Sequence, residues 1–574
     1  MSEVLKRYEA WIKEASLPDY LKMELQSIVG NYKEIEDRFY QKIQFGTGGM
    51  RGLLGAGTNR INIYTIRLVA EGLALHIQNH GEIAMQKGVV IAYDTRHFSE
   101  QFALEIAKTI GKYGIRVYLF EESRPTPELS FAVRQLGAFA GVVVTASHNP
   151  AEYNGFKVYG EDGGQLPPAA SDQIVRFMDS IENIFSIDIQ DENTMIKNGF
   201  LHYILKEIDD AYQECLLTLS EIELHSIKET LSIIYTPLHG SGLMPVTTGL
   251  KRFGFHNVTV VPEQADSDPD FPTVSYPNPE ERQAFELAIQ LGHKKEAELL
   301  LATDPDADRL GVAVRKDDGN YELLTGNQLG ALLLNYILLQ KNLKNEIPGN
   351  GIVLKTIVTS ELGRAIAEKF GVHTQDTLTG FKFISEKIEE YNSSGQFKFL
   401  FGYEESYGYL IGEFSRDKDA VQAALVTSEM AAYYKSIGIS LFDALTNLYN
   451  EFGYYKESLK SITLEGKDGQ DSIGQIMSGL RNHPPDSIGG IRIIALEDYK
   501  KRTRHEIHGE SIPISLPEAD VLKFFLEDDS WVCIRPSGTE PKCKLYFGVR
   551  KGSAEEAEAA LRMLEKDLME RIVL

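Results

Sequence analysis

The stretch VVIAYDTRHFSEQFALEIAKTIGKYGI, residues 89–115, contains the pattern that decides the fold. It opens with an apolar run typical of a buried strand and continues with apolar residues at helical spacing, up to a basic residue, an aromatic residue and Gly114. A glycine directly after a helix readily takes the left-handed conformation that ends it. The apolar residues after Gly114 predict another strand, so the stretch as a whole predicts a strand–helix–strand unit.

The same order returns twice further along the chain. The runs Arg252-Phe-Gly-Phe255 and Lys369-Phe-Gly-Val372 each follow an apolar strand, Ile233 to Thr236 in one case and Ile352 to Lys355 in the other. Strands that alternate with helices indicate largely parallel pairing, because each helix carries the chain back across the sheet. Three copies in one context predict three related α/β domains with mixed, largely parallel sheets.

The two ends of the chain depart from this pattern. Residues 1–44 show the spacing of amphipathic helices, and the C-terminal part is rich in predicted strands before a final helix from Ala554 to Arg571. We therefore expect a smaller C-terminal α+β domain. The predicted domains comprise residues 1–205 (the N-terminal helices and the first α/β domain), 206–322, 323–453 and, for the C-terminal domain, 454–574.

Composition narrows the class of protein. Apolar residues make up 43% and charged residues 25%, as in globular proteins, and the net charge of −24 disfavours nucleic acid and anionic lipid as partners. The three cysteines form no CxxC pair, which indicates a reducing compartment. The longest apolar run, Leu329 to Leu339, is shorter than the roughly 20 residues of a membrane span and predicts a core helix. With no apolar stretch typical of a signal peptide, we expect a cytoplasmic protein without a membrane or obligate protein partner.

Three carboxylates follow the apolar strand Glu298 to Ala302, in the run Asp304-Pro-Asp-Ala-Asp-Arg309. Their spacing sends Asp304, Asp306 and Asp308 to one side of a strand or of its curled end. Converging carboxylates repel one another unless a cation lies among them, and ligands that are all oxygen suit Mg²⁺. The run lacks the glycine and glutamate of a calcium EF-hand loop, which leaves a solvated acidic turn as the competing interpretation.

A serine lies where a β-branched strand ends, in the run Val142-Val-Val-Thr-Ala-Ser-His-Asn-Pro150. Ligand sites of open α/β sheets lie at the carboxyl ends of strands, so Ser147 is well placed for chemistry. The alternative is a turn serine that bonds its own backbone, and the flanking residues are not the glycines of a hydrolase elbow. After Asn154-Gly155, which predicts a tight turn, Lys157 lies on a short strand from which it can point back at this serine.

Three more loops carry polar groups of a particular kind. The run Arg535-Pro-Ser-Gly-Thr-Glu-Pro-Lys542 combines an arginine fork, two hydroxyls and a glycine, which is typical of a phosphate site but also of a polar hairpin. Leu378-Thr-Gly-Phe-Lys382 precedes a predicted helix, and Gly402-Tyr-Glu-Glu-Ser-Tyr-Gly408 follows a predicted strand. Carboxylates and a hydroxyl beside aromatic rings suit a sugar, although a Glu-Glu pair is more often a solvated face.

Together these runs resemble the α-D-phosphohexomutase family, and most closely its phosphoglucomutase branch. Thr145-Ala-Ser-His-Asn-Pro150 resembles the phosphoserine loop, Asp304 to Arg309 the magnesium loop, Gly402 to Ser406 the sugar loop and Arg535 to Thr539 the phosphate loop. They stand in the family's order, one in each predicted domain, and span nearly the whole chain. Tyr403, Tyr407 and the helical N-terminal extension depart from the shorter bacterial members and resemble the longer phosphoglucomutases and their phosphopentomutase-like cousins.

The resemblance implies an enzyme that interconverts glucose 1-phosphate and glucose 6-phosphate through phosphorylated Ser147 and a glucose 1,6-bisphosphate intermediate. It implies one Mg²⁺ per subunit, with Ser147, Asp304, Asp306 and Asp308 as its ligands. The implied catalytic groups are Ser147 with Arg51, His148, Lys157 and Lys382, and the residue that moves the proton stays open among His148 and the two lysines. The implied substrate-binding residues are Arg309, Thr379, Gly380, Glu404, Ser406, Lys418, Arg535, Ser537, Gly538 and Thr539.

Several alternatives remain at this point. The sugar favoured by the enzyme could be mannose or a pentose, which would make it a phosphomannomutase or phosphopentomutase of the same family, or the enzyme could be a bisphosphate-forming synthase. A phosphatase using the same serine and metal would release inorganic phosphate continuously, whereas a mutase conserves it. A noncatalytic sugar-phosphate binding protein is disfavoured because Ser147 and all three aspartates are present.

Overall fold

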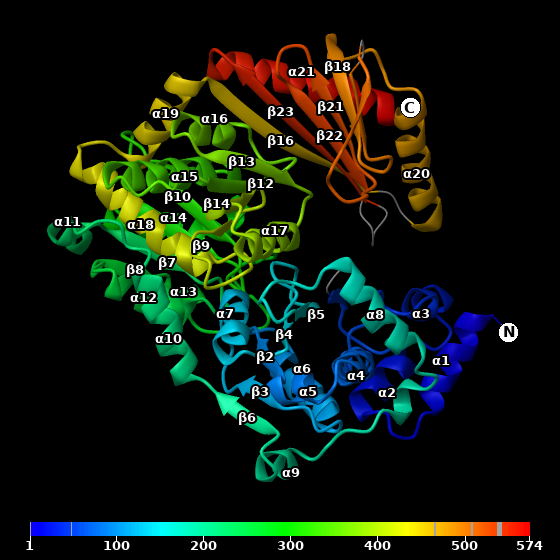
Figure 1. Cartoon of the computed structure of the whole chain (residues 1–574). Coiled ribbons are helices and arrows are strands. Elements are labelled where there is room, and N and C mark those ends of the chain that lie inside the picture. The colour runs from blue at the N-terminus through cyan, green and yellow to red at the C-terminus, as the bar shows by residue number, and fades with distance from the viewer. Residues whose placement is uncertain (1, 47–48, 464–465, 507–508, 537–541, 574) are drawn as a thin grey trace. The chain divides into compact units, whose positions relative to one another are not determined.

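A computed structural model describes residues 2–46, 49–463, 466–506, 509–536 and 542–573 of the chain (Figure 1). Two compact units form: the first comprises Met1–Gly326 with Phe381–Gly438, and the second comprises Asn327–Gly380 with Ile439–Leu574. Each unit is thus built from two separate stretches of the chain.

Short helices open the first unit: α1 (Glu3–Lys13), α2 (Asp19–Ser27) and α3 (Tyr32–Phe39). The side chain of Asn31 accepts a hydrogen bond from the backbone N–H of Glu34 and caps α3. Trp11 and Phe39 are buried in a small apolar core that also includes Tyr64 of the following helix. The helices predicted for residues 1–44 are confirmed.

The first α/β domain is a six-stranded sheet in the order β1-β5-β4-β2-β3-β6. Strand β2 pairs in parallel with β3 and β4, while β1, β5 and β4 pair antiparallel. Every residue of β2 is buried, as expected for a central strand with both faces covered. The elements are β1 (Gly49–Leu53), α4 (Ile63–Asn79), α5 (Glu82–Lys87), β2 (Val89–Tyr93), α6 (Ser99–Gly111), β3 (Val117–Phe120), α7 (Thr126–Leu136), β4 (Ala140–Val144), β5 (Tyr153–Tyr159), α8 (Pro168–Asp179), η1 (Ile184–Ser186), α9 (Glu192–Lys197) and β6 (Leu201–Ile204).

The second α/β domain has a five-stranded sheet in the order β11-β10-β9-β7-β8, in which β7 pairs in parallel with β8 and β9. Its core is apolar and includes Ile234, Phe285 and Leu300. The elements are α10 (Lys206–Leu217), α11 (His225–Thr230), β7 (Ile233–Thr236), α12 (Leu243–Arg252), β8 (Val258–Val260), α13 (Pro262–Ala265), η2 (Arg282–Phe285), α14 (Glu286–Lys295), β9 (Leu299–Thr303), β10 (Leu310–Arg315) and β11 (Tyr321–Leu323).

The next part of the chain contributes to both units. Strands β12 and β13 pair in parallel in the second unit, and β14 and β15 pair antiparallel in the first. The elements are α15 (Gly326–Leu343), β12 (Gly351–Thr356), α16 (Leu362–Lys369), β13 (His373–Thr377), α17 (Phe381–Ser394), β14 (Lys398–Glu404), β15 (Gly408–Leu410), α18 (Ala420–Ser436) and α19 (Leu441–Phe452).

The repeated strand–helix–strand pattern is confirmed in all three places. The strands pair in parallel in β2–β3, β7–β8 and β12–β13, and one helix connects the two strands of each pair along the chain: α6, α12 and α16 respectively. The glycines after these helices, Gly114, Gly254 and Gly371, have φ values of 69°, 94° and 70°. This left-handed conformation is the helix ending that the sequence predicts.

The C-terminal part of the second unit is an antiparallel sheet with helices, so the predicted α+β character is confirmed. The final helix α21, which is red in Figure 1, packs along β16 and β23. The elements are β16 (Tyr454–Thr463), α20 (Gly466–Asn482), β17 (Ser487–Ile488), β18 (Ile491–Asp498), β19 (Thr503–Glu506), β20 (Ser511–Pro513), β21 (Leu522–Leu526), β22 (Trp531–Pro536), β23 (Lys542–Lys551) and α21 (Ala554–Val573).

Two further expectations are settled by the fold. Residues 329–339 lie in α15, and most of their side chains are buried, as a core helix requires; across the described ranges, no helix has the length and apolarity to cross a membrane. The tight turn predicted at Asn154-Gly155 is wrong, because both residues belong to β5. Gly155 pairs with Arg51 of β1. Glycine is needed here because its lack of a side chain lets the neighbouring backbone come close, and not because the chain turns.

Candidate active site

Ser147 lies just after β4, in the loop that leads to β5, and its side chain is buried. Its φ of 50° is left-handed, which is uncommon for a residue other than glycine, and its N–H donates to Thr145 Oγ1 over 2.7 Å. Ser147 Oγ donates to Asp304 Oδ2 over 2.7 Å and lies 3.1 Å from His148 Nδ1. The loop therefore aims the hydroxyl at a carboxylate of the second domain.

Arg96 holds this serine loop in place from inside the protein. Its guanidinium donates to the backbone oxygens of Ser147, at 2.5 Å, of Asn149 and of Pro150, at 2.7 Å. The side chains of Arg96 and Asp94 are fully buried, and Arg96 Nε lies 3.3 Å from Asp94 Oδ2. A buried arginine with a carboxylate partner thus supplies the donors that the loop's carbonyl groups need.

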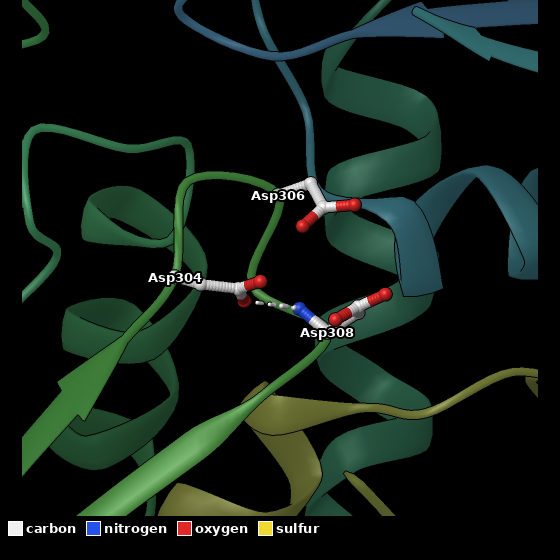
Figure 2. Close-up of side chains that lie close together, drawn as sticks. All are labelled: Asp304, Asp306 and Asp308. Carbon is white, nitrogen blue, oxygen red and sulfur yellow. Dashed lines mark hydrogen bonds between the residues drawn. The ribbon is translucent and has the colours of Figure 1, made fainter. Parts of the chain in front are cut away.

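Asp304, Asp306 and Asp308 converge in the turn between β9 and β10 (Figure 2). Their nearest carboxylate oxygens lie within 4.8 Å of one another, and all three residues are buried. The turn causes this convergence: Ala307 has a φ of 46°, and the N–H of Asp308 donates to Asp304 Oδ1 over 3.1 Å. Alternation along a strand is therefore not what brings the carboxylates together.

The donor set of this turn fits a divalent cation. Asp306 Oδ1 and Asp308 Oδ1 are buried and have no hydrogen-bond partner among the described residues. Oxygen ligands of this kind are those that Mg²⁺ and similar hard cations prefer. The three carboxylates could therefore hold a metal ion, and Ser147 Oγ lies next to the first of them.

Two lysines balance the charge of these carboxylates. Lys157 Nζ, from β5, lies 2.8 Å from Asp306 Oδ2 and 3.2 Å from Asp308 Oδ2, and Lys418 Nζ lies 3.1 Å from Asp308 Oδ2. Burial lowers the pKa of Lys157, but Asp306 and Asp308 outweigh it, so the pKa is raised above its ordinary value. For His148, burial and then Arg309 and Arg51 hold the pKa well below the usual range. Lys157 is thus an ammonium donor and His148 a neutral imidazole.

Two arginines complete the basic surroundings. Arg309 forms an ion pair with Glu280 and lies 3.9 Å from Asp308. Arg51, on β1, donates to Asn149 Oδ1 over 2.8 Å and so contacts the serine loop directly. Arg51, which the resemblance implies as a catalytic group, and Arg309, which it implies as a substrate-binding residue, are therefore both brought to this site.

The candidate sugar loop is tied to the carboxylate turn through the backbone. The N–H of Leu310 donates to the oxygen of Tyr407 over 3.1 Å. Glu404, the last residue of β14, is buried, and Ser406 lies in the half-buried turn that follows. Burial lowers the pKa of Lys418, but attraction to Asp308, Asp417 and Glu404 outweighs it, so the pKa is raised above its ordinary value.

The other predicted residues fall in different places. Lys382 is the second residue of α17, and its Nζ lies 4.9 Å from the ring centre of Phe383. Thr379, Gly380 and Arg535 belong to the second unit, whereas the residues above belong to the first. Ser537, Gly538 and Thr539 lie outside the described residues.

Several residues that shape this site are not among those predicted from the sequence. Arg96 and Asp94 hold the serine loop, Glu280 pairs with Arg309, and Thr126 Oγ1 donates to Asp306 Oδ2 over 2.8 Å. Asp94 and Arg96 follow β2, which is central and parallel, and polar residues at the carboxyl end of such a strand are a signal for a site. Glu280 and Thr126 carry no comparable local signal.

Models of one protein family match four successive parts of the chain. They are described as the phosphoglucomutase/phosphomannomutase α/β/α domains I, II and III, at residues 42–185, 210–319 and 325–452, and the C-terminal domain, at residues 494–566. The chain belongs to the phosphoglucomutase/phosphomannomutase family. The expected family and its fold class are thereby confirmed.

Individual members of the family are similar over most of their length. The phosphoglucomutase of Staphylococcus haemolyticus is 37% identical over 94% of this chain and 97% of its own. That of Staphylococcus saprophyticus subsp. saprophyticus is 39% identical over 90% and 92%. The crystal structure of pp63/parafusin from Paramecium, a phosphoglucomutase, shares the fold with a TM-score of 0.67 and 18% identity, over 93% of this chain and 95% of its own.

Proposed function

We propose that this chain is a phosphoglucomutase that interconverts α-D-glucose 1-phosphate and glucose 6-phosphate through phosphorylated Ser147. The observation that carries the proposal is the buried hydroxyl of Ser147, 2.7 Å from Asp304 in a group of three carboxylates. A nucleophilic hydroxyl beside a metal-binding carboxylate group suits phosphoryl transfer. Relatives 37% and 39% identical that bear the name phosphoglucomutase support the choice of sugar.

Asp304, Asp306 and Asp308, with Ser147, would hold one Mg²⁺. When bound, this ion withdraws charge from the phosphoryl group that is transferred. Lys157 and Lys418, both within 3.2 Å of Asp308 Oδ2, keep the site from becoming strongly negative. Arg309 and Arg51 add positive charge where the phosphoryl group of Ser147 must be balanced.

The reaction has two transfers. In the first, the sugar's 6-hydroxyl gives up its proton to a base as its oxygen bonds to phosphorus. The bond between phosphorus and Ser147 Oγ breaks and Ser147 Oγ takes up a proton, which yields glucose 1,6-bisphosphate. In the second, the bisphosphate has turned over and its 1-phosphate returns to Ser147, so that no phosphate is lost. His148 Nδ1 lies 3.1 Å from Ser147 Oγ, so the imidazole can exchange a proton with that oxygen. Lys157 and Lys382 are the other candidates for the group that moves the proton.

The remaining assignments concern the sugar and its second phosphate. Glu404 and Ser406 would bind sugar hydroxyls, and Lys418, whose Nζ lies 3.1 Å from Asp308 Oδ2, would bind a substrate phosphate. Thr379 and Gly380 would be substrate-binding residues, and Arg535, Ser537, Gly538 and Thr539 would hold the phosphate that does not react; these roles are carried over from the resemblance. The four domains would thus carry the phosphoserine, the metal, the sugar loop and the phosphate loop, in a cytoplasmic enzyme.

A coupled assay across glucose, mannose and ribose 1-phosphates, with and without glucose 1,6-bisphosphate, tests the proposal. We expect the glucose compound to be turned over fastest, with stimulation by the bisphosphate and without continuous release of inorganic phosphate. Ser147→Ala should abolish turnover and remove the phosphoryl group seen by intact-mass analysis, whereas Ser436→Ala, at an exposed position, should change neither. Normal turnover by Ser147→Ala would overturn the mechanism, and faster turnover of another sugar would overturn the substrate.

A further inference from the structure

A polar cavity of about 600 Å³ lies in the first unit, lined by residues other than those of the serine and carboxylate loops. Its walls come from Arg134 on α7, Asp162 after β5, Glu389 and Asn392 on α17, and Arg416 before α18. Among the described residues, the lining includes no aromatic side chain and no large aliphatic one. A nucleobase or a lipid chain would find no matching surface there.

Arg416 gives this cavity its chemical character. Its side chain is 2% exposed, and its Nη1 donates to the backbone oxygen of Glu413. The buried Nε makes no hydrogen bond to any described residue, although a guanidinium has five donors to satisfy. Buried polar groups in folded proteins almost always have partners, so this donor indicates an acceptor that comes from outside the chain.

Arg134 provides the second positive group. It donates from Nη1 to the backbone oxygen of Asp162 over 2.8 Å, which keeps it at the cavity wall. Burial and then the charge of Arg134 lower the pKa of Arg416, which places the two cations near each other. Two guanidinium groups on one cavity are the usual recognition elements for a phosphate, since each offers a planar fork of donors.

The acidic side chains of the cavity complement these arginines. Glu389 Oε2 and Glu413 Oε2 lie 3.7 and 3.8 Å from Arg416, which is beyond hydrogen-bond distance, so Nε of Arg416 still has a hydrogen to donate. Glu161 forms an ion pair with Lys87. Carboxylates and the amide of Asn392 accept hydrogen bonds from hydroxyl groups. A ligand that combines a phosphate with several hydroxyls satisfies both kinds of wall.

The cavity is also linked to the candidate active site by three consecutive residues. The N–H of Arg416 donates to Ser130 Oγ over 2.7 Å, Asp417 Oδ2 accepts from Tyr159 over 2.7 Å, and Lys418 reaches Asp308. A ligand that draws Arg416 toward it therefore acts on the same short segment that positions Lys418.

We propose that the cavity at Arg134 and Arg416 is a second sugar-phosphate site, distinct from the site of reaction, whose occupancy alters catalysis through Lys418. The effect on catalysis rests on the proposed function, whereas the binding site does not.

Equilibrium binding of glucose 6-phosphate, followed by calorimetry on the full-length protein, tests the site itself. We expect two classes of site in the wild type, and a Kd at least tenfold weaker for one class in Arg134→Met and in Arg416→Met. Arg134 is half-buried, so its variant keeps the test valid if Arg416→Met does not fold. Arg176→Met, which removes an exposed arginine of α8, should retain both classes. A single class that both Arg134→Met and Arg416→Met retain, or inorganic phosphate binding as tightly as the sugar phosphate, would overturn the proposal.

Sorbitol 6-phosphate, a sugar phosphate without an anomeric carbon, tests the link to catalysis. In wild type we expect it to change kcat as well as to compete with glucose 1-phosphate, and in Arg134→Met only the competition should remain. Purely competitive behaviour in both proteins would refute the link. Absence of mutase turnover would instead refute the proposed function and leave the binding result intact.

Discussion

Replacing Arg96 with methionine is the strongest test of how the serine loop is held. Methionine keeps the unbranched stem of arginine as far as the position of Nε but cannot donate to the oxygens of Ser147, Asn149 and Pro150, and it leaves Asp94 buried without its cation. A hydrogen bond that involves a charged group contributes about 1.5–3 kcal/mol, and removing one partner of a buried ion pair costs about 3–5 kcal/mol.

Not all of this loss needs to appear as global unfolding. If about 3 kcal/mol of it is the cost of ordering the loop for reaction, kcat falls roughly a hundredfold, since about 1.4 kcal/mol corresponds to a factor of ten. Arg96 does not contact the aspartates of the metal turn through any hydrogen bond that the described residues show, so the KM for glucose 1-phosphate should change much less than kcat.

The assay combines steady-state kinetics, thermal unfolding and the extent of Ser147 phosphorylation. Arg96→Lys, which keeps the charge but not the fork of donors, should be intermediate, and Asp94→Asn should resemble it. A variant Arg96→Met with a lower Tm but an unchanged kcat would show that Arg96 only stabilises the fold. Unchanged Tm and kcat together would refute the reasoning altogether.

Three further outcomes follow from the structure. Asp306→Asn should slow phosphoryl transfer by orders of magnitude, and a chelator should inactivate the wild type until Mg²⁺ is restored. Activity that does not respond to a chelator would show that the three aspartates form a solvated acidic turn and bind no catalytic metal. Gly155→Ala should lower both Tm and kcat, because a Cβ there would lie 2.5 Å from the backbone oxygen of Thr145 and 2.7 Å from that of Met50. Such an overlap costs at least about 1–3 kcal/mol of folding stability. An unchanged Tm in a melting scan would contradict this. Burial, and then His80, lowers the pKa of His76 to about 4, so the unfolded chain takes up this proton first as pH falls below about 6.5. About 2–3 kcal/mol of stability should therefore be lost between pH 6.5 and pH 4. Denaturant titrations should show a steeper loss of stability with falling pH in wild type than in His76→Gln, and identical pH profiles would exclude the effect.

The sequence by itself determined the local architecture and the chemistry of the loops. Strand, helix and terminating glycine are set by residues within a few positions of each other, so Gly114, Gly254 and Gly371 could be recognised without a structure. Runs such as Asp304 to Arg309 likewise carry their chemistry in neighbouring residues. The local pattern gave a wrong prediction at Asn154-Gly155. The glycine there lets β1 and β5 come close to each other and does not form a turn.

Only the tertiary structure decided which of these groups meet. Lys157 and Asp306 are 149 positions apart, and Ser147 and Asp304 are 157 apart, yet each pair is within 2.8 Å. Arg96 also donates to carbonyl oxygens of the serine loop, and Arg309 pairs with Glu280, 29 positions earlier. Nothing near either arginine in the sequence identifies these partners. The physical reason is that a contact between distant segments depends on how whole strands and turns pack, and one such packing sets all of these distances at once.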